Sequence, residues 1–161
     1  MNFDELLRRG NESADEYQSN LDEIEKTLDE LSQSLSKFLV CDLEVYKSID
    51  YVENVKTGLA ALTDPFAPKE KTGFINIHVR NVPTGETLKL FKLKYSSDVY
   101  PLTLSFDDKH YVAPCFPDFQ GNLGEVISST DFHLRLRHLK NRILKEEEKK
   151  RLKLGDSSTE D

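Results

Sequence analysis

The cysteine and histidine side chains are the groups of this chain that could support nucleophilic chemistry. Cys115 stands between Pro114 and Phe116, and His110 is the histidine nearest to it in the sequence. A cysteine nucleophile needs a histidine base within hydrogen-bond reach and a third group that orients the base. The spacing of these residues does not place His110 against the thiol. We therefore expect Cys115 to be a small buried thiol without a catalytic role.

Residue spacing also gives little support for metal binding or for paired carboxylates. His133 and His138 would lie about 140° apart around a helix, whereas a shared metal needs an i,i+4 pair. Asp107 and Asp108 are adjacent in an expected turn, where such residues commonly stabilise the turn itself. The sequence contains neither a glycine-rich phosphate-binding motif nor a G-x-S-x-G motif. It therefore predicts no catalytic, metal-binding or cofactor-binding residue, no cofactor, and a protein that is not an enzyme.

The densest charge pattern is a basic run near the C-terminus. Nine Lys and Arg residues lie between Arg135 and Lys153, interrupted by Glu146, Glu147 and Glu148. A helix of this kind could bind the phosphates of nucleic acid. Its basic face could instead be solvated, or meet the acidic N-terminal segment of the same chain or of a neighbouring copy. We prefer the second interpretation, because the net charge is −7 and no aromatic residue interleaves the run. Nucleic acid is kept as the alternative partner.

The first 39 residues combine ten acidic and four basic residues with the strongest packing signal in the chain. Apolar residues follow a 3-4 repeat, which on a helix makes one continuous seam of a and d positions. The seam consists of Ala14, Tyr17, Leu21, Ile24, Leu28, Leu31, Leu35 and Phe38. With Ala14 at an a position, the b and c positions form an acidic outer face made of Asp15, Glu16, Asp22, Glu23, Asp29 and Glu30.

The positions that flank the seam indicate how it is used. Dimeric coiled coils usually set partner and register with charged e and g residues. Here these positions are mostly small or neutral, and Glu25 is the exception: they include Gln18, Asn20, Thr27, Ser32 and Ser34. We therefore expect the seam to pack against other parts of the same chain, with self-association as the alternative.

The long helix needs a beginning and an end. A short helical turn at the N-terminus is expected to stop at Gly10, because glycine commonly follows the last turn of a helix. Asn11 or Ser13 can then cap the long helix. The seam predicts that this helix ends at Phe38 or Leu39.

Residues 42–62 fit either a strand or a helix, because their apolar residues satisfy both spacings. Asp50 and Glu53 resemble a capping box just before an apolar run. We favour a helix that ends near Leu62 and forms an antiparallel hairpin with the first helix. Two prolines and a charged triplet then predict a linker of about ten residues.

From Gly73 onward the apolar period changes to two, which is typical of half-buried strands. Turn residues separate the runs, so the segment predicts a four-stranded antiparallel meander. The expected strands are 74–80, 87–95, 100–106 and 110–113. Such a sheet needs a cover on one face, and the helices are the obvious cover.

The C-terminal part is expected to begin with a loop over 114–122, followed by a helical turn near 123–127. Ser129 or Thr130 then caps the last helix. Its apolar stripe consists of Phe132, Leu136, Leu139 and Ile143. Favourable i,i+4 charge pairs allow the helix to continue past Leu144, and the tail over 155–161 is expected to be disordered.

The sequence therefore predicts an α+β fold with a long N-terminal helix, a probable helical hairpin, a four-stranded antiparallel β-meander and a C-terminal helix. The expected organisation is an N-terminal helical region over 1–62, a meander plus C-terminal helix over 73–144 packed as one domain, and a charged helix extension with a disordered tail over 145–161. The expected core consists of Leu28, Leu31, Leu35, Ile75, Ile77, Leu102, Leu104, Leu136 and Leu139.

Two widely separated cysteines, no apolar signal segment and no membrane-length apolar run favour a cytoplasmic protein with reduced thiols. The preferred hypothesis is a non-enzymatic protein–protein interaction protein, such as an adaptor, assembly subunit or inhibitor, that acts through its long amphipathic helix and charged helix faces. The alternatives are a nucleic-acid-associated protein that uses the basic C-terminal helix and a small enzyme of unknown type. Its partner would be another protein, within a larger complex or as a homo-oligomer. The expected contact residues are the acidic outer face and Arg135, Arg137, Lys140, Arg142, Lys145, Lys149 and Lys150.

Overall fold

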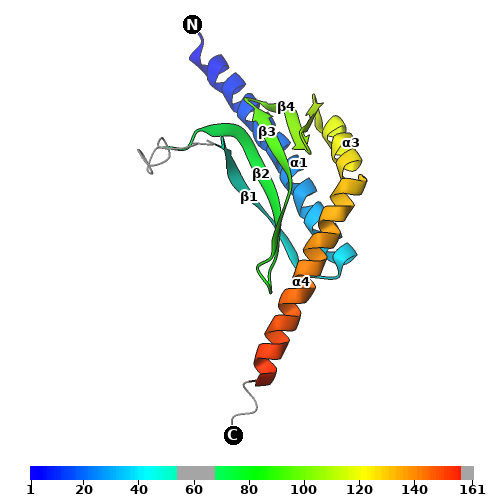
Figure 1. Cartoon of the computed structure of the whole chain (residues 1–161). Coiled ribbons are helices and arrows are strands. Elements are labelled where there is room, and N and C mark those ends of the chain that lie inside the picture. Colours follow the sequence, from blue (N-terminus) through cyan, green and yellow to red (C-terminus); the bar gives the residue numbers. More distant parts are fainter. Residues whose placement is uncertain (54–67, 157–161) are drawn as a thin grey trace.

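The structure is a computed structural model, which describes residues 1–53 and 68–156. Within these residues, a long helix is followed by five antiparallel strands and two further helices (Figure 1). The expected α+β class is confirmed, with one strand more than expected. The elements are α1 (Phe3–Leu39), β1 (Leu43–Tyr51), β2 (Lys71–Asn81), β3 (Thr87–Ser96), β4 (Val99–Phe106), β5 (Lys109–Ala113), α3 (Phe116–Ile127) and α4 (Thr130–Asp156).

Helix α1 runs without interruption through Gly10, so the expected stop at that residue is wrong. Asn2 caps the helix, since its Oδ1 accepts a hydrogen bond from the Glu5 backbone N–H at 3.4 Å. A glycine inside a helix costs about 1 kcal/mol relative to alanine. The ion pair between Arg8 and Glu12, at 2.5 Å, bridges the turn that contains Gly10 and partly offsets this cost.

Only the C-terminal half of the α1 seam is buried. Its buried members are Ile24, Leu28, Leu31 and Leu35, and Leu39 replaces the expected Phe38, which is 62% exposed. A straight helix drifts by about 20° per heptad against a 3-4 repeat, so the core-facing stripe moves off Phe38 by the end of the helix. The expectation of an internal seam is therefore correct for this half alone.

The expected helical hairpin is absent from the described residues, because residues 43–51 form strand β1. This strand pairs antiparallel with β2, for example Val45 with Val79 and Ile49 with Ile75. Pairing with a neighbouring strand decided between the two spacings that the segment satisfies, as tertiary context often does. The rest of the expected second helix falls partly on residues 54–62, which lie outside the described residues.

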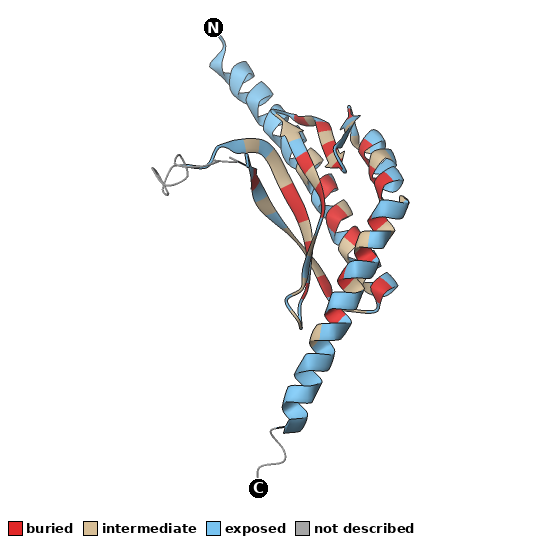
Figure 2. Cartoon of the chain, viewed as in Figure 1, coloured by how far each residue is buried: buried red, intermediate tan, exposed pale blue. Residues whose placement is uncertain are grey.

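The strands follow the order β1-β2-β3-β4-β5, and each is antiparallel to its neighbours. Helix α1 contacts β1 and β4, α3 contacts β4 and β5, and α4 contacts β3. These helices lie on one face of the sheet (Figure 1), and buried residues of the helices and strands form one core cluster. Figure 2 marks the buried residues along the ribbon. The other face carries no described helix, an arrangement that antiparallel sheets tolerate.

We call this uncovered side the open face. The strand register and the alternation of side chains assign to it Glu44, Tyr46, Ser48, Phe74, Asn76, His78, Arg80, Lys89, Lys92, Lys94, Thr103, Ser105 and His110. The helix-covered face carries the expected core. Every expected core residue is buried except Ile75, which is half-buried against the core.

The C-terminal region is more helical than expected, because α3 begins at Phe116, within the expected loop over 114–122, and includes the expected helical turn near 123–127. Pro117 lies in the first turn of this helix, where a missing backbone N–H costs nothing. The expected cap of α4 is confirmed, since Ser129 Oγ accepts a hydrogen bond from the Phe132 backbone N–H at 3.3 Å. The expected apolar stripe of α4 is buried, and the helix continues to Asp156. The expected disordered tail over 155–161 is therefore wrong for residues 155 and 156, and the rest of it lies outside the described residues.

Replacing both Leu28 and Leu31 by alanine should strongly destabilise the fold. Both side chains are buried in the core, and each such truncation costs about 2–5 kcal/mol. Thermal unfolding followed by circular dichroism should show a clearly lower melting temperature. The matched control is Leu152→Ala, at a position that is 65% exposed, which should melt like the wild type. An unshifted melting temperature for the double variant would contradict the packing described above.

Candidate functional site

Cys115 and His110, the candidate nucleophile and base considered from the sequence, do not contact each other in the structure. Cys115 is exposed rather than buried, and its thiol donates a hydrogen bond to Asp118 Oδ2 at 3.0 Å. The His110 ring lies on the open face against Phe74, with ring centroids 5.8 Å apart. The expectation of a buried thiol fails because Cys115 is the N-cap residue of α3, and not part of a loop folded against the core.

One serine and one histidine do lie at the distance that a catalytic pair requires. Ser48 Oγ is 2.8 Å from His78 Nε2, and it also accepts a hydrogen bond from Asn76 Nδ2 at 3.3 Å. The His78 ring stacks on Tyr46, and burial, with a smaller contribution from the charge of Lys89, lowers the pKa of His78. Among the described residues no carboxylate bonds to the second ring nitrogen, so the orienting group of a triad is missing.

Metal binding finds no support in the described residues, where no group of three or more His, Cys, Asp and Glu side chains could hold an ion. The adjacent Asp107 and Asp108 do not act together. The Asp107 carboxylate pairs with Arg135 of α4, and both residues have positive φ angles typical of a tight turn. They remain the turn formers that the sequence predicts.

An acidic side chain on the open side of the sheet fixes the position of Lys92. Asp50 is 8% exposed and accepts hydrogen bonds from Thr72 Oγ1 at 2.8 Å and from Lys92 Nζ at 2.9 Å. Burial alone would raise the pKa of Asp50. The hydrogen bonds from Lys92, Thr72 and Asn76, with the charge of Lys92, outweigh burial and lower the pKa below its ordinary value.

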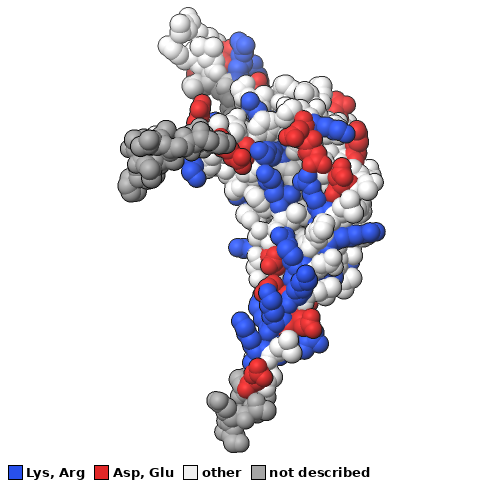
Figure 3. Space-filling view, viewed as in Figure 1, with Lys and Arg blue, Asp and Glu red and all other residues white. Residues whose placement is uncertain are grey.

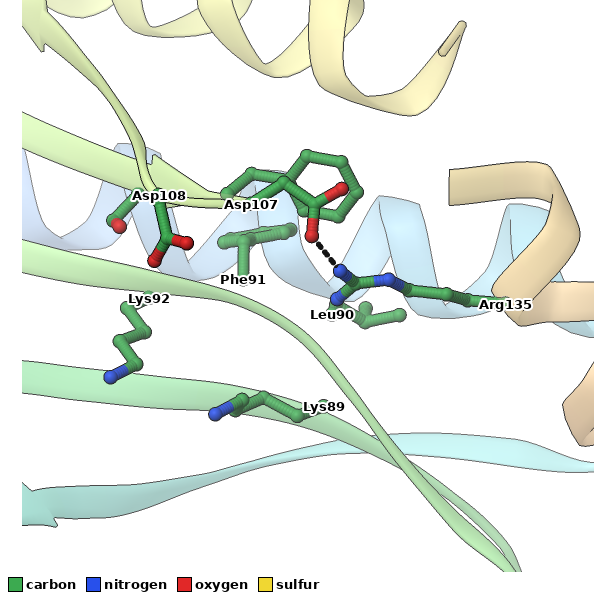
Figure 4. A pocket seen from close by; sticks show the side chains of 9 residues that line it. Lys89, Leu90, Phe91, Lys92, Asp107, Asp108 and Arg135 are labelled. Atoms are coloured by element: carbon green, nitrogen blue, oxygen red, sulfur yellow. Dashed lines mark hydrogen bonds and ion pairs between the residues drawn. The ribbon is translucent and has the colours of Figure 1, made fainter. Parts of the chain in front are cut away.

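A β-bulge places Lys89 and Lys92 on the same face of the sheet. Three positions separate them, an odd interval that would put them on opposite faces of a regular strand. In this sheet Lys89 pairs with His78 and Lys92 pairs with Asn76, with Leu90 as the extra residue of the bulge. Both side chains therefore extend from β3 toward the same side (Figure 4).

Next to this bulge β3 separates from β4, and α4 lies along the strand that is left free. The last β3–β4 pair on this side is Lys92 with Ser105. Beyond it, α4 contacts β3, and Arg142 donates a hydrogen bond to the Thr87 carbonyl oxygen at 2.5 Å. Arg135 reaches from α4 toward the same gap, where its guanidinium lies 4.7 Å from the ring centroid of Phe106 (Figure 4).

Two neighbouring hollows occupy this junction and share Arg135. The first has a volume of about 230 Å³ and is lined by Lys89, Leu90, Phe91, Lys92, Ser105, Phe106, Asp107, Asp108 and Arg135. The second has a volume of about 400 Å³ and is lined by Leu88, Arg135, His138, Asn141, Arg142 and Lys145. We call the two hollows together the basic groove. Lys and Arg side chains gather in a stripe that runs from the sheet along α4 (Figure 3).

Positive charge in the basic groove exceeds the carboxylates that line it. Five lining residues are cationic, whereas Asp107 and Asp108 are the acidic ones. Arg135 and Arg142 pair with Asp107 and Glu86, respectively. Within the described residues no ion pair involves Lys89 or Lys145, so both charges are available to a ligand.

The expected contact residues are spread over several surfaces. The six acidic residues of the α1 outer face are all exposed. The basic residues of α4 divide, because Arg135, Arg142 and Lys145 line the groove and Lys140 contacts the Val40 carbonyl oxygen. Within the described residues no ion pair joins α1 to α4, so the in-chain contact, one of the alternatives for the basic run, is not formed. The basic residues meet the sheet, which lies closer to them.

A further surface, absent from the sequence-based expectations, is the N-terminal part of α1. We call Phe3–Asn20 the N-terminal arm; it extends beyond the sheet in Figure 1. Phe3 and Leu7 are 68% and 72% exposed and continue the 3-4 repeat of the seam through Gly10. This signal was available in the sequence, but the supposed stop at Gly10 concealed it.

Comparison with protein family models, with curated proteins and with solved structures gave no match. Among the helices that the structure describes, none combines the length and the apolar character needed to cross a bilayer. The residues of the arm and of the basic groove therefore carry the functional interpretation.

Replacing Asp50 by asparagine should make stability less sensitive to acid. Because the folded pKa lies below the unfolded value, the carboxylate contributes stability that is present above about pH 4 and lost as pH falls through the folded pKa. Urea unfolding at several pH values below about 6 should give a shallower fall for the variant. Asp98→Asn, at an exposed turn residue, is the control and should keep the wild-type slope. Parallel slopes for Asp50→Asn and wild type would contradict the described role of Lys92.

Proposed function

We propose that this chain is a non-enzymatic protein–protein interaction protein, an adaptor or assembly subunit that pairs through its N-terminal arm. The observation that carries the proposal is the seam of α1, whose apolar repeat continues for two further heptads beyond the part that the sheet covers. The exposed apolar stripe continues the buried stripe of the same helix with the same 3-4 spacing. Such a stripe is suited to packing against a second helix. In an arm surrounded by water, the same apolar side chains would bury no surface and contribute no stability.

The occupant that fits the arm best is a second copy of it, in the antiparallel direction. The sheet covers the seam of α1 from Ile24 onward. In a parallel pair the sheets of the two copies would lie at the same level beside this seam and would collide. An antiparallel pair places the two sheets at opposite ends. In the antiparallel pair, Phe3 of one copy lies opposite Ala14 of the other, and Leu7 lies opposite Gly10. Each large side chain thus faces a small residue, which permits the two helices to approach closely.

Charge is compatible with self-pairing. The e and g positions of the arm are mostly neutral, with Asn11, Ser13, Gln18 and Asn20 among them, so two copies meet without strong repulsion. The acidic residues Asp15 and Glu16 lie at b and c positions, outside the contact. The remaining charged faces, on α1 and α4, are left for further partners.

The proposal places the protein in the cytoplasm. Both cysteines are free, and the Cys115 thiol is exposed. Exposed free thiols persist in reducing compartments, whereas oxidising compartments convert them to disulfides.

Leu7→Asp should abolish pairing without unfolding the protein. Light scattering coupled to size exclusion should show a wild-type dimer that dissociates on dilution, and a monomeric variant. The dissociation constant should rise by at least about 100-fold, because both copies lose a leucine whose burial contributes about 1.5–3 kcal/mol. Circular dichroism should confirm that the variant keeps its strands and its melting behaviour.

The matched control is Leu152→Asp, which places the same charge at an exposed leucine of α4. It should leave the dimer intact. A wild-type chain that stays monomeric at every accessible concentration would contradict self-pairing, and a dimer that both variants weaken equally would contradict the assignment to the arm.

A further inference from the structure

The basic groove concentrates positive charge on a chain whose net charge is −7. Five cationic residues of β3 and α4 line two adjoining hollows that total several hundred cubic ångströms. Bringing like charges together costs free energy unless anions are present. Asp50, Asp107 and Glu86 pair with Lys92, Arg135 and Arg142, respectively, which leaves two of the five cations unpaired within the part of the chain that the structure describes. Lys89 and Lys145, which have no ion pair among the described residues, are the cations best placed to meet a ligand.

Aromatic rings lie on the open face, beside the groove. Tyr46 stacks on His78 with ring centroids 4.8 Å apart, and Arg80 lies 5.7 Å from the Tyr46 centroid. Phe74 stacks on His110, and Lys94 lies 5.6 Å from the Phe74 centroid. Each ring pair thus already holds a cation, and none of the four rings is fully buried.

The strand register joins these rings to the groove. His78 of the first ring pair is opposite Lys89, which lines the groove. His110 of the second pair is opposite Ser105, which is itself opposite Lys92, and both of these residues line the groove. Cations that could bind phosphates and rings that could stack on bases therefore lie on neighbouring strands of the open face.

We propose that the basic groove and the adjoining open face form a binding site for single-stranded nucleic acid. Proteins that bind single strands combine a positively charged groove, which follows the backbone, with aromatic side chains that stack on bases. Base stacking needs bases whose faces are free, and a duplex hides them, so the rings favour a single strand over a duplex. An acidic protein segment would use the cations but would leave the rings without a role.

This site shares no residue with the N-terminal arm, so it goes beyond the proposed function. No aromatic residue interleaves the basic run of α4, so the sequence alone favours a protein partner and leaves nucleic acid as the alternative. The fold supplies the missing rings from β1, β2 and β5. Arg135 and Arg142 position α4 along the groove through their contacts with Asp107 and the Thr87 carbonyl oxygen.

Fluorescence anisotropy of the full chain with labelled oligothymidylate and oligouridylate tests the proposal. Binding should weaken steeply with salt, with a logarithmic slope of about −3 for four phosphate contacts. The double variant Lys89→Ala and Lys145→Ala should bind more weakly and reduce the slope by about 1.4. The control Lys26→Ala and Lys37→Ala removes the same charge from exposed positions outside the groove and should bind like the wild type. A difference between the two oligonucleotides identifies RNA or DNA as the preferred form.

The aromatic contribution needs its own variant, because charge alone would also attract other polyanions. Phe74→Leu keeps an apolar side chain but removes the ring, and should weaken single-strand binding at least about fivefold without changing the salt slope. Circular dichroism and thermal melting establish that the variants are folded. Polyglutamate and a DNA duplex serve as competitors, and both should compete much less well than a single strand.

Four outcomes would overturn the proposal. These are no binding to either oligonucleotide at low salt, equal weakening by the groove variant and its charge-matched control, unchanged affinity of Phe74→Leu, and competition by polyglutamate or duplex as strong as by the single strand. The Leu7→Asp variant should bind oligonucleotide like the wild type, so the outcome for the groove is independent of the outcome for the arm.

Discussion

Burial of the α1 side chains beneath the sheet is the interaction on which the other elements depend. Ile24, Leu28, Leu31 and Leu35 are each nearly inaccessible, and together they contribute on the order of 6–12 kcal/mol by burial. That is comparable with the whole net stability of a typical domain. Because α1 contacts both β1 and β4, it joins strands from both sides of the meander. Without it, neither the sheet nor the position of α4 against β3 would be stable.

This packing also accounts for the uneven distribution of function over the molecule. The helices satisfy the apolar needs of one face of the sheet, which leaves the open face free for polar and aromatic side chains. Helix α1 has 37 residues and is about 55 Å long, whereas the longest strand has 11 residues. A sheet of this size cannot cover the helix over its full length, so an uncovered arm is a geometric result of helix length.

The sequence predicted the features that depend on local pattern. Leu28, Leu31 and Leu35, the strands of the meander and the Ser129 cap could all be found from spacing and residue type. It failed where distant segments decide the outcome. Strand β1 exists because β2 offers it an edge, and the bulge at Leu90 is visible only when two strands are aligned. The basic groove joins Lys89 to Arg135, and their separation in the chain hides their proximity. The arm is hard to find in the sequence for a different reason, because Gly10 resembles a helix stop although its helix penalty is modest.

The bulge has a consequence for how β3 could change in length. Side chains alternate between faces, so adding or removing one residue normally exchanges the two faces of a strand. Here the extra residue is already absorbed, and a chain that lacked Leu90 would return β3 to regular alternation with Lys89 still opposite His78 and Phe91 still opposite Ile77. Such a deletion would preserve every face assignment in β3. What it would remove is the local bend, and with it the divergence of β3 from β4 that makes room for the groove. In β3, Leu90 therefore determines the local bend of the strand, whereas the pairing of β3 with β2 does not depend on it.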